Sequence, residues 1–223
     1  MDESSVNVLV RRTPRKRAQS VASIEKILDS ALELMVSRGF NATTVDDIAH
    51  KVGLTKGAVY FHFENKTAIL MALLDIIEKL LIGGLLERVM GAGPSSRDRL
   101  VAALHNQGLL AGSKTKYLLL FTLILLEFNG TGDEIETRVR RIYDNLIEEM
   151  RKIVRDGLND GDFDSTLDAR ELVAVIMALQ HGTLMEWYCR SDQLNGQSLV
   201  RTARVVLLNG LLNSRSSRGK HDE

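Results

Sequence analysis

The sequence predicts an all-α protein with about nine helices, and three observations support this prediction. Apolar residues recur every three to four positions along most of the 223 residues, only two prolines interrupt them, and no segment alternates as a β-strand does. The chain is longer than a typical domain, so one or two domains are expected. With 44% apolar and 26% charged residues, it has the composition of an ordinary globular protein.

A basic segment precedes the first predicted helix. The stretch "RRTPRKR" holds five cations, one proline and no acid, which is typical of a disordered arm attracted to a polyanion. We therefore expect residues 1–19 to form such an arm, and a solubilising tail is the alternative. The five cations are Arg11, Arg12, Arg15, Lys16 and Arg17.

Two helices are expected next. The apolar spacing predicts an amphipathic helix over residues 20–38, which Gly39 ends. Thr44 and Asp47 have the spacing of a capping box. They predict a second helix of about eight residues, which ends at Gly53.

The second predicted helix is closely followed by two more. Thr55 is expected to cap a third helix that runs to about residue 63, and Asn65 a fourth that ends at Gly83-Gly84. A tight turn over residues 52–54 joins the second helix to the third. Two short helices joined in this way are typical of a helix-turn-helix, whose second helix is free to enter the major groove of DNA.

The remainder of the chain predicts longer helices and a second domain. The first domain is expected over residues 20–66 and the second over residues 67–213, followed by a polar tail over residues 214–223. The helices of the second domain are expected over residues 97–110, 116–128, from after Asp133 to about Gly157, 168–189 and 197–212.

Charge and composition narrow the function. The net charge is zero, which excludes a uniformly basic nucleic-acid binder, although residues 1–70 hold ten Lys and Arg against eight Asp and Glu. The longest apolar run, residues 117–126, is far shorter than the roughly 20 residues of a membrane helix. Without a signal-peptide pattern, we expect a cytoplasmic protein with no membrane partner. The single cysteine, Cys189, forms no internal disulfide and is expected to be a small buried residue.

The third predicted helix has two different faces. At about 100° per residue, Val59 and Phe63 point inward, whereas Lys56, Gly57 and Tyr60 point outward. A glycine inside a helix costs about 0.5–1 kcal/mol relative to alanine, so close approach by another surface would explain it. The outward face is therefore a candidate contact surface.

The stretch "GFNATTVDDIAHKVGLTKGAVYFHFENKTAIL", residues 39–70, closely resembles the DNA-binding segment of TetR-family transcriptional regulators. The shared features are the Gly-aromatic turn, the Thr-Thr pair before a helix, the glycine at the turn, Lys-Gly, the paired aromatics, and the lysine before the fourth helix. The resemblance identifies the third helix as the recognition helix. It implies DNA contacts at Thr44, Thr55, Lys56, Gly57, Ala58, Tyr60, His62 and Lys66.

The same resemblance implies the architecture and the mode of action. A three-helix DNA-binding domain would be joined to a helical domain for ligand binding and dimerisation. The protein would be a bacterial repressor that binds a palindromic double-stranded DNA operator as a homodimer and leaves it when a small, hydrophobic effector binds. Ala58 stands where a polar residue can occur in relatives, which leaves the operator sequence open, and the basic arm would reach the minor groove or flanking phosphates.

Two further sets of residues follow from the resemblance. The effector pocket is expected among the middle helices, and the homodimer contact on the last two helices, with core packing inside one subunit as the alternative for each set. The pocket candidates are Phe121, Phe128, Met177, His181, Met185 and Trp187. The dimer candidates are Leu172, Val175, Ile176, Leu179, Val205, Leu208 and Leu212.

The acidic stretch "DGDFDSTLDARE" partly matches a calcium loop. Its carboxylates occupy the ligand positions of an EF-hand, but Ser165 stands where the sharp turn of that loop needs glycine. Capping of the following helix explains the last two acids as well, so no metal is expected. The carboxylates are those of Asp160, Asp162, Asp164, Asp168 and Glu171.

An enzyme or a helical interaction protein without DNA binding is the alternative function. The sequence has no glycine-rich phosphate loop, no metal-ligand spacing such as HExxH and no nucleophile motif. We therefore expect neither an enzyme nor a cofactor.

Overall fold

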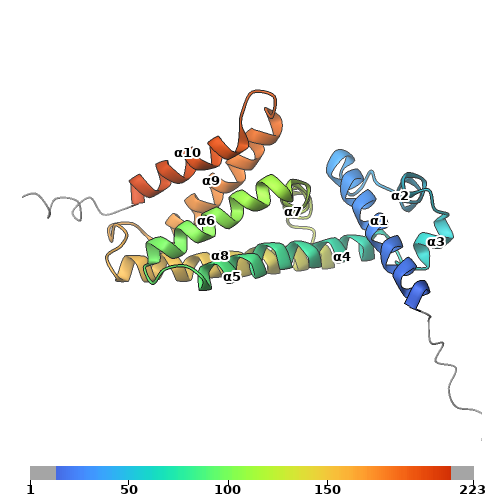
Figure 1. Ribbon diagram of the computed structural model, residues 1–223, viewed down its shortest axis with the longest axis horizontal. Helices are drawn as coiled ribbons and strands as arrows, with labels where there is room; N and C mark the ends of the chain where they lie inside the picture. The colour runs from blue at the N-terminus through green and yellow to red at the C-terminus, as the bar shows by residue number, and fades with distance from the viewer. Residues whose placement is uncertain (1–13, 212–223) are drawn as a thin grey trace, which may run out of the picture. The chain divides into compact units, whose positions relative to one another are not determined.

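The computed structural model describes the backbone of residues 14–211 and the side chains of residues 20–210. Within these residues the protein consists of ten α-helices and one π-helical segment, without a strand (Figure 1). The all-α prediction is confirmed. The chain divides into two compact units, Met1–Leu70 and Met71–Glu223.

The first unit contains helices α1 (Pro14–Arg38), α2 (Val45–Val52) and α3 (Lys56–Tyr60), and the start of α4 (Lys66–Glu78). Helix α1 packs on α2, and α2 packs on α3. Their contact buries one apolar stripe from each helix. The fully buried residues of this contact are Ile27, Ala31 and Met35 of α1, Ile48 of α2 and Val59 of α3.

Helix α1 begins earlier than the sequence indicated. The arm was expected over residues 1–19, but the backbone is helical from Pro14 onward. Proline is well suited to the first turn of a helix, where its missing N–H has no partner to lose. Arg15, Lys16 and Arg17 thus lie on a helical backbone, and Arg11 and Arg12 lie outside the described residues.

The fourth predicted helix does not end at Gly83-Gly84. It passes through a π-helical segment, Lys79–Gly83, and continues as α5 (Gly84–Met90). The packing of Gly84 gives the physical reason: a Cβ atom there would lie 3.1 Å from Oδ1 of Asn106, which is almost fully buried. This glycine therefore allows two helices to approach each other rather than ending one.

The second unit is built from α4's continuation and five longer helices. These are α6 (Ser96–Ser113), α7 (Thr115–Glu127), α8 (Glu134–Asn159), α9 (Ala169–Cys189) and α10 (Gly196–Leu211). Helix α6 packs against α5, α8 and α10, and α9 packs against α8 and α10. Helices α9 and α10 form an antiparallel pair (Figure 1). The core between them includes Leu100, Val154, Phe163 and Ile176, none of which has exposed surface.

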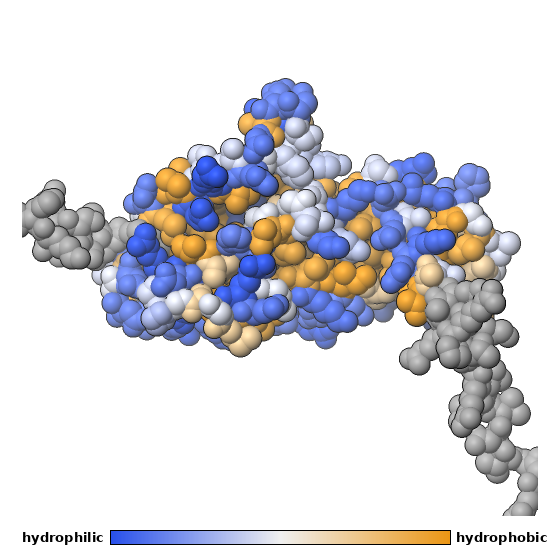
Figure 2. Space-filling view, in the orientation of Figure 1, coloured by the Kyte–Doolittle hydropathy of each residue, from blue (hydrophilic) through white to orange (hydrophobic). Residues whose placement is uncertain are grey.

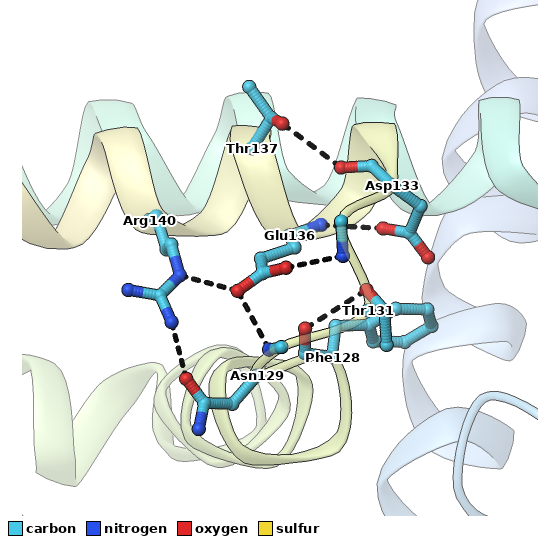
Figure 3. Close-up of polar contacts among 9 residues, drawn as sticks. Phe128, Asn129, Thr131, Asp133, Glu136, Thr137 and Arg140 are labelled. Atoms are coloured by element: carbon cyan, nitrogen blue, oxygen red, sulfur yellow. Dashed lines mark hydrogen bonds and ion pairs between the residues drawn. The ribbon is translucent and has the colours of Figure 1, made fainter.

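The turn between α7 and α8 is held by one carboxylate (Figure 3). Oε1 of Glu136 accepts a hydrogen bond from the amide of Gly130 at 2.8 Å, and Oε2 accepts one from the amide of Gly132 at 2.6 Å. The guanidinium of Arg140 donates to the same carboxylate at 2.6 Å. The amide of Gly130, followed by that of Gly132 and by Arg140, lowers the pKa of Glu136 to about 2.

None of the described helices is by itself long and apolar enough to cross a membrane. Helices α6 and α7 satisfy the length and composition only when taken together, and they are bent by 103° relative to each other.

Candidate functional site

The outward face of α3 is the first candidate site. Thr55 caps this helix, because its hydroxyl accepts a hydrogen bond from the amide of Ala58 at 3.2 Å. Val59 is fully buried and anchors the helix to the first unit, whereas Lys56, Gly57 and Tyr60 are exposed. The predicted division of this helix into two faces is confirmed for these four residues.

The aromatic residues after α3 divide less sharply than the helical wheel indicated. Phe63 was expected to be core beside Val59 but is only partly buried. Phe61 has 67% of its surface exposed, and its ring meets that of His62 edge to face at 5.1 Å. Phe61 is thus an exposed aromatic beside the candidate surface.

Thr44 begins α2 with a complete capping box, as predicted. Its hydroxyl accepts from the amide of Asp47 at 3.1 Å, and its own amide donates to Oδ2 of Asp47 at 3.0 Å. The hydrogen bonds from Thr44 lower the pKa of the Asp47 carboxyl. The turn that follows α2 uses Gly53 at φ 73°, a backbone conformation that favours glycine.

Lys56 is held by an acid in the free protein. Its ammonium lies 2.8 Å from Oδ2 of Asp46, and this hydrogen bond raises the pKa of the lysine. Both side chains are more than half exposed. Ion pairs of this kind contribute little to stability, so the ammonium can exchange this carboxylate for another anion at small cost.

Lys66 is better accommodated than the sequence indicated. A cation in the first turn of a helix opposes the helix dipole, but its ammonium donates to the carbonyl oxygen of Phe40 at 2.7 Å and lies 4.2 Å from the centre of the Phe40 ring. These contacts link the start of α4 to the turn after α1. Asn65 caps α4 as predicted, since its side-chain oxygen accepts from the amide of Ala68 at 2.8 Å.

A cavity of about 490 Å³ between α6, α9 and α10 is the second candidate site. Its wall is mainly apolar and includes Leu104, Leu184 and Leu207, with Trp187 at one side. Apolar residues also gather on the face of the second unit shown in Figure 2, with polar residues bordering them. Volume and lining are those of a small-molecule site.

Most of the predicted pocket residues lie elsewhere. Of the six, Trp187 alone lines the cavity. Phe121, Phe128 and Met177 are buried in the core, where the alternative interpretation placed them. Met185 is exposed on α9. His181 stacks on the ring of Tyr143 at 5.9 Å, and burial lowers the pKa of its imidazole.

Most of the cavity wall could not be predicted from the sequence, because it is made of residues that carry no distinctive signal. Several are amides or glycines, such as Gln107, Gly108 and Gln180. The signal that could have indicated a narrow, open helix face was a pair of glycines four residues apart: Gly108 inside the predicted helix over residues 97–110, and Gly112 just beyond its expected end.

The predicted dimer residues that the structure describes differ in exposure. Leu172 and Ile176 were expected at the interface but are buried in the core of the subunit, whereas Val175 and Val205 are exposed. Leu179 and Leu208 are partly buried. Leu212 lies outside the described residues.

The exposed apolar residues of α9 follow a stripe that the prediction only partly included. Val175, Ala178, Gly182 and Met185 repeat every three to four positions and are all exposed. Cys189, expected to be buried, is exposed at the end of the same helix.

The acidic residues of the suspected calcium loop do not converge. Asp162 accepts hydrogen bonds from the amides of Ser96 and Arg97 and so caps α6, while Asp168 accepts from two amides and caps α9. Asp164 accepts from the amide of Thr166 at 3.0 Å. Among the described residues, no three His, Cys, Asp or Glu side chains are placed to hold a metal ion, so the geometry does not support the calcium hypothesis for this loop.

Comparison with known proteins yields matches to both units. The family model described as "Bacterial regulatory proteins, tetR family" matches residues 27–73, which include the second half of α1, all of α2 and α3, and the start of α4. The crystal structure of the MbdR regulator from Azoarcus sp. CIB is 40% identical in sequence, with a TM-score of 0.79 over 86% of this chain and 100% of that one.

Two further relatives are more distant. The HTH-type transcriptional regulator SrpR of Pseudomonas putida is 28% identical over 179 residues, which cover 79% of this chain and 80% of SrpR. The structure of the transcriptional regulator FadR from Bacillus subtilis, in complex with stearoyl-CoA, is 21% identical, with a TM-score of 0.65 over 83% of this chain and 98% of that one. The second of these likenesses concerns the fold alone.

Proposed function

The chain belongs to the tetR family of bacterial regulatory proteins and is a DNA-binding transcriptional regulator; from this premise, we propose that it is a homodimeric repressor that a small hydrophobic effector releases from a palindromic operator. A repressor of this kind binds the chromosome, so the proposal includes a location in the bacterial cytoplasm. The observation that carries the proposal is the exposed face of α3, where Lys56, the side-chain-free Gly57 and Tyr60 lie together.

Gly57 supports this interpretation because the fold does not require a glycine there. A Cβ atom at this position would meet nothing within 4 Å, and no positive φ demands glycine. Alanine would therefore fit the free protein and favour the helix by about 0.5–1 kcal/mol. A glycine retained at this cost is explained by close approach of the DNA.

The proposed contacts divide between bases and phosphates. Lys56, Gly57 and Ala58 lie nearest the base edges in the major groove. Thr44, Thr55, Tyr60, His62 and Lys66 fix the register on the phosphate backbone, with the basic arm in the minor groove or on flanking phosphates. Lys66 would share its ammonium between a phosphate and the carbonyl of Phe40, which it contacts in the free protein.

The test of the DNA-binding proposal starts from an operator selected in vitro from random duplexes. Lys56→Ala and Gly57→Ala are then measured on it by fluorescence anisotropy. Both should weaken binding, and Gly57→Ala should do so without lowering the melting temperature, because its Cβ fits the free protein. Lys51→Ala is the matched control, since this lysine pairs with Glu33 on α1 and lies outside the proposed surface. Unaltered operator binding by both α3 variants would refute the role of α3.

The homodimer is proposed to form through the exposed apolar face of α9 and α10. On α9 this face consists of the exposed residues Val175, Ala178, Gly182 and Met185, and we assign the exposed Val205 and Val206 of α10 to it as well. Spacings of three and four residues are those of helices that pack in bundles. The small residues allow the two copies of α9 to approach closely. A palindromic operator follows from the two-fold symmetry of such a dimer.

The effector is proposed to occupy the cavity between α6, α9 and α10. Its apolar wall suits a hydrophobic molecule, and a relative of the same fold has been crystallised with stearoyl-CoA. Titration of the protein–operator complex with candidate effectors, followed by anisotropy, tests release. An effector that binds the cavity without changing operator affinity would contradict this part of the proposal.

A further inference from the structure

The cavity between α6, α9 and α10 has a single charged residue in its described lining. Arg204 of α10 is partly buried there, and no hydrogen bond or ion pair joins its guanidinium to any other side chain within residues 20–210. The other polar residues of the lining are neutral, namely Gln107, Gln180, Thr183, Ser191, Asn195 and Gln197. Because this described lining contains no Asp or Glu, the fixed charge that it contributes is positive.

An unpaired guanidinium in a partly dry, apolar cavity favours an anionic partner. Burial removes part of the water that would solvate the charge, and no carboxylate among the described side chains replaces it. The planar fork of arginine matches a carboxylate with two parallel hydrogen bonds. The volume of about 490 Å³ falls within the range of roughly 300–1,000 Å³ that is usual for small-molecule sites.

We propose that the effector is an organic acid, whose alkyl or aromatic body fills the apolar part of the cavity and whose carboxylate binds Arg204. The inference rests on the proposed function, because it names the chemical class of the effector. An uncharged molecule with the same body would leave the guanidinium without a partner and lose the charge-assisted hydrogen bonds.

Trp187 makes the inference directly measurable. It lines the cavity and is the only tryptophan of the chain, so its fluorescence reports occupation of this site. The full-length protein is titrated with decanoate and with phenylacetate, the aliphatic and the aromatic acid. Decanol and phenylethanol are the uncharged counterparts. We expect at least one acid to bind about 10- to 100-fold more tightly than its alcohol, the range for hydrogen bonds between charged groups.

Variants on α10 test whether Arg204 causes this preference. Arg204→Gln should abolish the preference for the acid while the affinity for the alcohol stays the same. Arg204→Lys keeps the charge and should retain most of the preference. Arg201→Gln is the matched control: it removes the same charge from an exposed position of the same helix and should leave the preference intact. Melting temperatures of the variants show that each is folded.

Two outcomes would overturn the inference. In the first, Arg204→Gln still prefers the acid over the alcohol. In the second, neither acid changes the Trp187 fluorescence of the wild-type protein, or neither binds more tightly than its alcohol. Operator binding is measured on the same samples. If it persists, the effector class alone is wrong. If the wild-type protein lacks selective operator binding, the proposed function fails independently of the effector.

Discussion

Gly108→Ala is the sharpest stability test. From the sequence this substitution is expected to stabilise the protein, whereas the structure predicts that it destabilises it. Alanine inside a helix is normally better than glycine by about 0.5–1 kcal/mol. At position 108 of α6, however, the new Cβ would lie 2.8 Å from Cγ1 of Val200 on α10. Two carbon atoms pack best at about 3.5–4.0 Å, and Val200 is β-branched and has little freedom to turn away.

The magnitude follows from these opposing effects. Overpacking of this kind costs about 1–3 kcal/mol, which equals or exceeds the helical gain, so Gly108→Ala should lower the free energy of unfolding. Gly112→Ala is the control: it lies one turn further along α6 and also lines the cavity, but its Cβ would meet nothing within 4 Å. Gly112→Ala should therefore be neutral or stabilising.

Thermal unfolding followed by circular dichroism compares the two variants. One fixed protein concentration is needed, because a dimer's melting temperature depends on concentration. Each kcal/mol shifts the melting temperature of a chain of this size by about 2–4 °C, so Gly108→Ala should melt several degrees below Gly112→Ala. In a Val200→Ala background, the collision disappears and Gly108→Ala should become stabilising. Gly108→Ala melting at or above Gly112→Ala would refute the reasoning.

Three other predictions follow. The folded pKa of Glu136, about 2, lies below its ordinary value of 4.5, so the stabilisation from this carboxylate is present above about pH 4.5 and is lost as the pH falls towards 2. The difference in melting temperature between wild type and Glu136→Gln should therefore shrink over this range. A difference that stays constant would contradict this prediction. Gly157→Ala would place a Cβ atom on the ring of the fully buried Phe163 and should cost about 1–3 kcal/mol, measured as a lower denaturation midpoint. Val175→Glu on the exposed face of α9 should convert dimer to monomer in sedimentation velocity, whereas Met90→Glu, at an exposed position of α5, should not.

The features that the sequence predicted correctly are those that depend on near neighbours in the chain. A capping box needs only a side chain and an amide three residues away, so Thr44 could be assigned without knowledge of the fold. The caps by Thr55 and Asn65 have the same local origin. The faces of α3 could be assigned because this short helix has a single buried side.

The features that it predicted wrongly depend on contacts between distant segments. Gly84 resembled a helix end, but its role depends on Asn106, which lies 22 positions further along the chain. The cavity depends on where α10 crosses α6, which apolar periodicity does not encode. Residues such as Gln107 and Arg204 become notable only when the crossing places them around one space.

Helix α9 shows why its two faces could not be told apart from the sequence. Leu172, Val173, Ile176 and Met177 face the core of the subunit, while Val175, Ala178 and Met185 lie on the exposed side. Both stripes have helical spacing, so periodicity gives no single inward direction. Helix α8 differs: its buried residues form one stripe, and most of its other positions are charged. A helix that is apolar on two sides is expected to be buried on both. One subunit covers only one side of α9. We therefore expect a second copy of the chain to cover the other side.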